Sequence, residues 1–201
     1  MLLRHSPTSP FVRKVMLLLH ETGQADRVST ESVDGWAEPD HLTGDNPLSM
    51  VPTLVLDDGS SLYDSTVICE YLDRQHGGPR MIPEDGDARW QVLREQALAD
   101  GMIECAILIM MEEMKRPAEK RWDWWLDLKR RAILRSLDHL EQTVEGLADR
   151  VDLGTIATAV ALGYLDLRGG VGQWREGRPA LTAWFDQFSA RASMQATAPP
   201  A

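Results

Sequence analysis

The sequence predicts an α/β domain with a mixed sheet, followed by an all-α domain. Short β-prone runs alternate with helical periodicity only in the first third of the chain, whereas every periodic segment after residue 86 has helical spacing. Between these parts, Gly77-Gly78-Pro79 and the breakers from Pro83 to Gly86 interrupt the pattern. We therefore expect an N-terminal domain over 1–78 and an all-helical C-terminal domain over 86–201.

In the N-terminal domain, the expected order of elements is β-α-β followed by β-β-α. Ser9 is a preferred N-cap and Pro10 suits the first helical position, so a helix begins there directly after a short strand. Asp57-Asp58-Gly59 predicts a hairpin turn between two β-prone runs. The expected strands cover 1–4, 28–33, 53–56 and 61–63, and the expected helices begin at 10 and 64. A β-α-β unit requires a parallel pair and a hairpin an antiparallel pair, which gives a mixed sheet.

The C-terminal domain is expected to consist of four helices. They cover 87–115, 121–147, 156–167 and 179–192. The segment 156–167 is apolar nearly all round, which predicts a buried central helix. The longer helices are amphipathic, so each places one face against a common core.

The charge and the cysteine content argue against several classes of function. The net charge is −10, and an acidic surface repels phosphate backbones, so we expect no nucleic acid partner. Cys69 and Cys105 lie in helix-like stretches, which indicates buried thiols and no disulfide or metal site. No apolar window is long enough to span a membrane, and the N-terminus is too short and polar for a signal peptide. We expect a cytoplasmic protein that has no membrane partner and needs no metal.

A first candidate site lies where the opening helix begins. Ser6, Thr8 and Ser9 place hydroxyl groups beside a helix N-terminus, which carries unpaired N–H groups and a partial positive charge. An anion is stabilised there, and thiol pKa values fall at such positions. A Ser hydroxyl adds a hydrogen bond to a thiolate. Taken alone, these residues are better explained by Ser9 capping its helix, because Ser is a preferred cap in any protein.

Two further candidates follow along the chain. A proline before a strand, Pro52 after Val51, is ordinary in the trans form; in the cis form it turns the backbone of Val51 outward, ready to pair with a peptide ligand. Asp64 and Ser65 bring an acid and a hydroxyl to another helix N-terminus, where they match the ammonium and carboxylate of an amino acid. Local reasoning alone favours a trans bond at the first position and simple capping at the second.

Together these segments resemble the glutathione S-transferase family over essentially the whole chain. The segments that carry the resemblance are Ser9-Pro10-Phe11-Val12-Arg13-Lys14-Val15, Asn46-Pro47-Leu48 with Val51-Pro52-Thr53-Leu54, Asp64-Ser65 leading to Ile68-Cys69-Glu70-Tyr71-Leu72, and Leu162-Gly163-Tyr164-Leu165-Asp166-Leu167-Arg168. The turn before the first helix is similar to that of bacterial members with a serine-type active site. The resemblance implies a thioredoxin-like N-terminal domain, a helical transferase domain and a homodimer.

The resemblance also implies roles for individual residues. Ser9 is the expected catalytic hydroxyl, which hydrogen-bonds the thiolate of glutathione, with Thr8 or Ser6 as neighbours that could replace it. Val51, before a cis Pro52, is expected to pair with the cysteinyl part of glutathione. Asp64 and Ser65 are expected to hold the γ-glutamyl end. Glutathione is then a co-substrate, and the second substrate is a small hydrophobic electrophile, as in detoxification.

Two kinds of alternative remain within this resemblance. The same site can serve a glutathione-dependent isomerase, dehalogenase or peroxidase, or a binding or regulatory protein without catalysis.

The chain also departs from the family pattern at single residues. Met50 stands where many relatives carry a Lys or Gln near the glycyl carboxylate, and His41 or Arg13 are the candidates to replace that Lys or Gln. The buried helix of relatives opens with a Ser or Thr cap and an acidic residue three positions later. Here Asp152 and Thr155 stand at these positions, so we expect Asp152 to cap the helix and the reciprocal bond from an acidic residue to be lost. Asp166 resembles a buried structural acid of the family.

Overall fold

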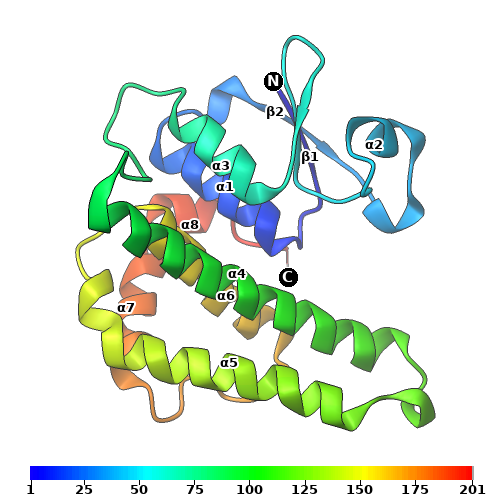
Figure 1. The fold of residues 1–201 in the computed structure, drawn as a ribbon, viewed down its shortest axis with the longest axis vertical. Coiled ribbons are helices and arrows are strands. Elements are labelled where there is room, and N and C mark those ends of the chain that lie inside the picture. The colour runs from blue at the N-terminus through cyan, green and yellow to red at the C-terminus, as the bar shows by residue number, and fades with distance from the viewer. Residues whose placement is uncertain (201) are drawn as a thin grey trace. The chain divides into compact units, whose positions relative to one another are not determined.

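The computed structural model describes residues 1–200 and divides into two compact units (Figure 1). The first unit comprises Met1–Arg89 together with the chain from Ala192 on, and the second comprises Trp90–Arg191. The sequence placed the end of the chain in the helical domain, whereas here the chain begins and ends in the first unit. Within residues 1–200, no helix combines the length and the apolar character that crossing a membrane requires.

The first unit has the predicted β-α-β and β-β-α order. Its elements are β1 (Leu2–His5), α1 (Pro10–Glu21), β2 (Ser29–Ser32), α2 (Asp40–Asp45), β3 (Thr53–Val55), β4 (Ser61–Leu62), α3 (Ser65–Asp73) and α8 (Ala192–Ala196). Single 3₁₀ turns lie at Ala25–Arg27 and Gly35–Ala37. The segment between β2 and β3 contains the six-residue α2.

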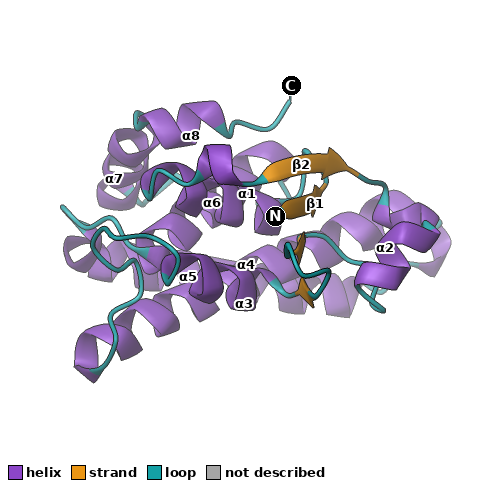
Figure 2. Ribbon diagram, turned by 90° about the horizontal axis from the view of Figure 1, so that it is seen from above, coloured by secondary structure: helices purple, strands orange, loops and turns teal. Residues whose placement is uncertain are grey.

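The four strands form one mixed sheet in the order β2-β1-β3-β4 (Figure 2). β1 is parallel to β2 and antiparallel to β3, and β3 is antiparallel to β4. β1 and β4 therefore run in the same direction, and β3 runs in the opposite direction. It follows that the segment after β1, the segment before β3 and the segment after β4 all lie at one end of the sheet.

The core of this unit lies between the sheet and its helices. Leu3 and Leu54, which are paired across β1 and β3, are fully buried. The helices α1 and α3 contact each other and run side by side in Figure 1, with Leu17, Leu18, Ile68 and Leu72 fully buried. β2 is short and all four of its residues are exposed, as suits an edge strand. The apolar face of each helix thus fixes where its N-terminus lies at the sheet.

A short C-terminal helix, α8, packs against α1 in the first unit. Arg13 Nη2 donates a hydrogen bond of 3.2 Å to the carbonyl oxygen of Met194, and Ser193 Oγ donates to the carboxylate of Glu21. The sequence predicted one helix over 179–192; the structure has α7 (Pro179–Ser189), a break, and then α8. A five-residue helix has too few positions to show periodicity, so it is defined by these contacts.

The second unit is helical, as predicted. Its elements are α4 (Gly86–Lys115), whose first turn belongs to the first unit, α5 (Asp123–Thr143), a 3₁₀ turn at Val144–Leu147, α6 (Leu153–Arg168) and α7. Every residue from Leu153 to Leu162 is buried, which confirms α6 as the central helix. The other helices contribute buried side chains at Val92, Ile103, Ile109, Ile133, Leu137, Leu181 and Phe185.

The last turn of α6 departs from the prediction. Asp166 is not buried, because 37% of its side chain is exposed. Its carboxylate accepts a 2.6 Å hydrogen bond from Trp174 Nε1 and pairs with Arg175. Asp166 lies on the solvent side of α6, where its hydrogen bonds to Trp174 and Arg175 hold the segment between α6 and α7 in place. A structural role therefore stands, but burial was a wrong expectation.

The start of α6 is capped by Asp152, as predicted, and the reciprocal bond that an acidic residue cannot supply here is made by the hydroxyl of Thr155. The Thr155 N–H donates to Asp152 Oδ1 at 3.0 Å, and the Asp152 N–H donates to Thr155 Oγ1 at 3.0 Å. A threonine hydroxyl is therefore sufficient as the reciprocal acceptor. The same carboxyl group, through Oδ2, is bonded by Arg150 Nε at 2.8 Å, and Arg150 also holds both carboxylate oxygens of Glu95.

Candidate functional site

Ser9 lies at the N-terminus of α1 and caps it, as predicted. Its Oγ accepts a 3.3 Å hydrogen bond from the Val12 N–H, and Pro10 occupies the first helical position, where no N–H is needed. A hydroxyl that accepts through its oxygen still has its own proton to donate. The first turn of α1 contains no acidic residue. Ser9 can therefore donate to an anion that the helix dipole also attracts.

The neighbours of Ser9 are placed differently. The Ser9 N–H donates to the Ser6 carbonyl at 3.0 Å, which closes the turn between β1 and α1. Thr8 is exposed within that turn. His5 ends β1, and burial lowers the pKa of its imidazole, so it is neutral at pH 7. Of the three hydroxyl residues, Ser9 is the one whose side chain bonds to the helix end.

The segment before β3 holds the backbone of Val51 in a fixed position. The Val51–Pro52 peptide bond is cis, as the resemblance implied and local reasoning did not. Asn46, which is 1% exposed, donates from Nδ2 to the Met50 carbonyl at 3.1 Å and to Thr53 Oγ1 at 3.0 Å. Thr53 Oγ1 donates to the same Met50 carbonyl at 2.8 Å. Among residues 1–200, the N–H and the C=O of Val51 make no hydrogen bond.

Asn46 was missed as a functional residue in the sequence. The Asn-Pro pair was visible, and an Asn side chain that bonds the backbone two residues later is a turn signal. The Leu48 N–H does donate to Asn46 Oδ1 at 3.0 Å. What the sequence did not show is that the same side chain also supports Met50, directly before Val51. This contact makes Asn46 a positioning residue for the Val51 backbone.

At the start of α3, Asp64 is the N-cap and Ser65 is the first helical residue. Asp64 Oδ1 accepts a 3.0 Å hydrogen bond from the Thr66 N–H, and the side chain is exposed. Ser65 is 3% exposed. A carboxylate that caps with one oxygen can accept an ammonium group with the other. The Ser65 N–H at the helix end is suited to a carboxylate.

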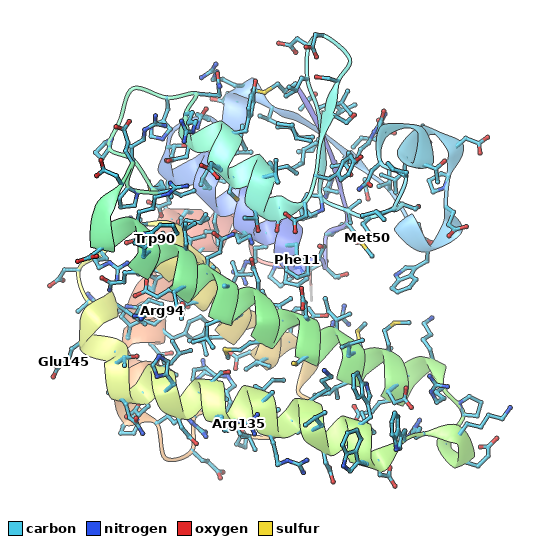
Figure 3. All side chains as sticks on the ribbon, viewed as in Figure 1. Phe11, Met50, Trp90, Arg94, Arg135 and Glu145 are labelled. Atoms are coloured by element: carbon cyan, nitrogen blue, oxygen red, sulfur yellow. The ribbon has the colours of Figure 1, made fainter. Side chains whose placement is uncertain are left out.

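The sheet topology brings these three positions together. Ser9 follows β1, Val51 precedes β3 and Ser65 follows β4, so all three lie at the same end of the sheet. Figure 3 marks this end by Phe11, in the first turn of α1, and by Met50, next to Val51. The arrangement provides two helix N-termini on either side of a free peptide backbone. It can hold an extended peptide that carries a thiolate and a free amino acid end.

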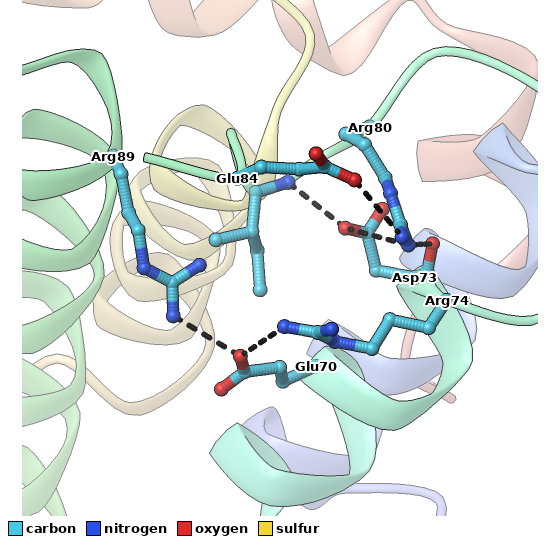
Figure 4. Close-up of a pocket in the computed structure, with 7 residues that line it drawn as sticks. Glu70, Asp73, Arg74, Arg80, Glu84 and Arg89 are labelled. Carbon is cyan, nitrogen blue, oxygen red and sulfur yellow. Dashed lines mark hydrogen bonds and ion pairs between the residues drawn. The ribbon is translucent and has the colours of Figure 1, made fainter. Parts of the chain in front are cut away.

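A second group of charged residues surrounds a small pocket between α3 and the start of α4 (Figure 4). Asp73, which is 2% exposed, accepts from the Met81 N–H at 2.7 Å and from the Ile82 N–H at 3.2 Å. Hydrogen bonds from Arg89 and Arg74 lower the pKa of Glu70. All these charges are paired within the protein, which makes the group structural. No three His, Cys, Asp or Glu side chains among residues 1–200 are placed to hold a metal ion.

The chain matches known proteins along its whole length. Residues 8–75 match the family described as the N-terminal domain of glutathione S-transferase. The chain is 37% identical over 198 residues to the GST-like protein YibF of Escherichia coli (strain K12), and the match covers 97% of this chain and 96% of that protein.

Two solved structures are similar over the full chain. A glutathione transferase family member from Pseudomonas fluorescens Pf-5, solved with bound glutathione, has 47% identity and a TM-score of 0.96, covering 100% of this chain and 99% of that one. A family member from the same organism with bound S-(propanoic acid)-glutathione has 46% identity and a TM-score of 0.92, covering 100% of both chains. The fold is therefore shared with these two proteins over the full length of the chain.

Proposed function

Because the chain belongs to the glutathione S-transferase family, we propose that it binds glutathione beside Ser9, Val51 and Ser65 and conjugates it to small hydrophobic electrophiles. The observation that carries this proposal is the meeting of two helix N-termini and the unpaired backbone of Val51 at one end of the sheet. The glutathione bound by the Pseudomonas relative supports the choice of ligand.

In this proposal, each group of the site holds one part of glutathione. Val51 pairs with the cysteinyl backbone, Asp64 accepts the γ-glutamyl ammonium group, and Ser65 binds the γ-glutamyl carboxylate. Ser9 donates its hydroxyl proton to the sulfur. Thr8 lies beside the sulfur in the turn, and Ser9 is assigned as the donor because its side chain is the one that bonds to the helix end. Pro52, through its cis bond to Val51, turns the Val51 backbone toward the ligand.

The chemistry needs only a stabilised thiolate. A free thiol has a pKa near ~8.5, and lowering it by ~2 units corresponds to about 2.7 kcal/mol of preference for the thiolate. A helix N-terminus supplies roughly 0.3–2 kcal/mol and a hydrogen bond to a charged group about 1.5–3 kcal/mol. These two contributions suffice together. The thiolate then attacks carbon of the electrophile and forms a C–S bond. With a halide substrate the carbon–halogen bond breaks and halide leaves; with an epoxide the C–O bond breaks and the alkoxide takes a proton from water; with an α,β-unsaturated compound the thiolate adds to the double bond and the resulting carbanion takes a proton from water.

The test is the pKa of the bound thiol, followed through the ultraviolet absorbance of the thiolate against pH. Ser9→Ala removes the hydrogen bond and is expected to raise this pKa by about 1–2 units. Thr8→Ala is the matched control and leaves it unchanged. Because Ser9→Ala also costs the helix about 1 kcal/mol, folding is checked by circular dichroism. A pKa that does not move in Ser9→Ala contradicts the assigned role.

The reaction is then identified with a panel of electrophiles. Aryl halides, epoxides and α,β-unsaturated compounds report conjugation, while peroxides and haloalkanoates report the peroxidase and dehalogenase alternatives. Acrylate and 3-halopropanoates belong in the panel because the Pseudomonas relative binds S-(propanoic acid)-glutathione. Binding of glutathione without turnover of any compound would favour a binding or regulatory protein.

We extend the proposal to the assembly and location of the protein. Members of the family usually form homodimers, and we propose a cytoplasmic homodimer here. Light scattering after size exclusion measures the mass in solution. A monomer at all accessible concentrations would contradict this part of the proposal and leave the thiol chemistry untouched.

A further inference from the structure

Three large apolar side chains are exposed in the two loops that precede Val51. Trp36 is 75% exposed, Leu48 64% and Met50 63%, and we call these three residues the apolar rim. Trp36 and Met50 belong to different loops, but Ser49 connects them, since its Oγ donates to the Gly35 carbonyl at 3.3 Å. Large apolar groups gathered at the surface of a soluble domain indicate a binding surface. The rim directly adjoins the site proposed for glutathione.

The charges around the apolar rim are acidic. Between Arg27 and Arg74 the sequence contains no Lys or Arg, and the part from 31 to 50 contains five carboxylates: Glu31, Asp34, Glu38, Asp40 and Asp45. The nearest guanidinium in the sheet, that of Arg4, is bonded to Asp45 at 2.8 Å and paired with Glu31. His41 lies 3.7 Å from the carboxylate of Glu31. Within β1 and the segment from 28 to 73, a negative group at the rim therefore meets no unshared Lys or Arg.

Arg13 cannot supply the missing positive charge. Its guanidinium donates to the Met194 carbonyl of α8, and its Nε is buried without a hydrogen-bond partner among the described residues. Burial lowers the pKa of this guanidinium, in keeping with a group held inside the unit. Both replacements considered from the sequence, His41 and Arg13, are thus engaged elsewhere.

The sheet order indicates which end of the ligand reaches the rim. On the proposed function, the γ-glutamyl end lies at the start of α3, which follows the edge strand β4, and the cysteinyl residue lies at Val51, before β3. In the order β2-β1-β3-β4, the step from the γ-glutamyl to the cysteinyl residue runs from β4 to β3. An extended ligand that continues in this direction places its third residue toward β1 and β2. The segment 33–50, which follows β2, carries the apolar rim on that side. The glycyl end of glutathione therefore points toward the rim.

The loops that carry the rim are held in place. Asn46 and Thr53 both donate to the Met50 carbonyl, at 3.1 and 2.8 Å. A Cβ added at Gly35 would lie 2.9 Å from the Ser49 carbonyl oxygen, so the two loops pack backbone to backbone. Ligand binding alone is thus not expected to rearrange these loops or to change the charges around the rim.

We propose that this protein recognises the γ-glutamyl-cysteinyl part of its thiol ligand and gives no counter-charge to the glycyl carboxylate, so that thiols with an esterified or amidated glycyl end are ligands too. The inference rests on the proposed function and specifies the ligand class of that site. Removing the terminal charge removes repulsion from the acidic segment and leaves an end that can contact the apolar rim.

The experiment compares glutathione with its glycyl monoethyl ester by isothermal titration calorimetry. The wild-type protein is expected to bind the ester as tightly as glutathione or more tightly. Met50→Lys introduces the missing cation and should strengthen glutathione binding about 2- to 5-fold, the range of an exposed ion pair, without strengthening that of the ester. Gln75→Lys makes the same change of charge at the far end of α3, where Gln75 is exposed, and leaves the ratio of the two affinities unchanged.

The outcomes separate this inference from the proposed function. A wild-type preference of tenfold or more for glutathione over the ester would overturn the inference while the glutathione site stands. An equal gain in Gln75→Lys and Met50→Lys would overturn it as well, because the effect would then be one of overall charge. Absence of binding by either thiol would overturn the proposed function itself.

Discussion

Asp152 and Thr155 exchange hydrogen bonds across the first turn of α6, each backbone N–H donating to the other side chain at 3.0 Å. Thr155 is fully buried, so Thr155→Val keeps the shape but leaves the Asp152 N–H without its acceptor. We expect a loss of about 0.5–2 kcal/mol in the free energy of unfolding, measured by urea denaturation. Thr155→Ser retains the hydroxyl and is the control; an equal loss in both variants would mean that packing, not capping, matters here.

Gly154 packs directly against Glu95, which predicts a severe effect of adding one methyl group. A Cβ at Gly154 would lie 2.4 Å from Glu95 Oε2 and 3.0 Å from Glu95 Cβ. Gly154→Ala must displace Glu95 from Arg150, and we expect a cost of roughly 1–3 kcal/mol. Gly101→Ala, in α4 with open space around the position, should stabilise by about 0.5–1 kcal/mol. Thermal unfolding of the two variants gives shifts of opposite sign if the close contact is real.

Asn46 bonds to the Met50 carbonyl, directly before Val51, whose backbone we propose to bind the cysteinyl residue of glutathione. Asn46→Ala removes two donated bonds and one accepted bond, so we expect a loss of about 1–3 kcal/mol in stability. Because the Met50 carbonyl is also released, the Kd for glutathione should rise at least about tenfold, measured by calorimetry on folded protein. Thr43→Ala, which removes a hydrogen bond within α2, is the control. Unchanged affinity in a folded Asn46→Ala protein would speak against the positioning role.

The pair of Arg89 and Glu70, joined at 3.0 Å, predicts a pH-dependent contribution to stability. Arg89 lowers the pKa of Glu70 in the folded protein. The stabilisation is therefore present above the ordinary Glu pKa and disappears as the pH falls through the lowered one. Arg89→Met should cost about 0.2–1 kcal/mol at pH 7, because Glu70 is 39% exposed and the pair is screened.

The check is denaturation of the wild type and Arg89→Met at neutral and acid pH. The difference between the two proteins should be largest at pH 7. Below the lowered pKa of Glu70 it should shrink to the pH-independent part that comes from the hydrogen bond of Arg89 to the Pro83 carbonyl. Arg74→Met is the comparison, since Arg74 is 58% exposed and should contribute less. A difference that grows on acidification would have the wrong sign for this pair.

Local signals predicted much of the fold and of the site. The caps at Ser9, Asp64 and Asp152 depend on a few neighbouring residues, and the structure has all three. The breakers and the change of periodicity separated the α/β part from the helical part. Hairpin chemistry at Asp57-Asp58-Gly59 placed the β3–β4 pair.

What could not be predicted depends on contacts between distant segments. The position of α8 rests on Arg13 and Glu21, more than 170 residues earlier in the chain. The exposure of Asp166 depends on which side of α6 meets its neighbours, and an apolar run does not show this. Asn46 supports Met50 only because the loop folds back on itself. The roles of Ser9, Val51 and Ser65 remain predictions, which the thiol titration tests.

The return of the chain to its starting unit has a practical consequence for protein engineering. A fragment cut once after Arg89 would lose Ser193 and Met194, and with them the groups that bond to Glu21 and Arg13. We expect that fragment to be less stable than one to which the last nine described residues are rejoined by a flexible linker. An affinity tag added after residue 201 should therefore be joined through a flexible spacer, so that it does not disturb the contacts of α8 with α1.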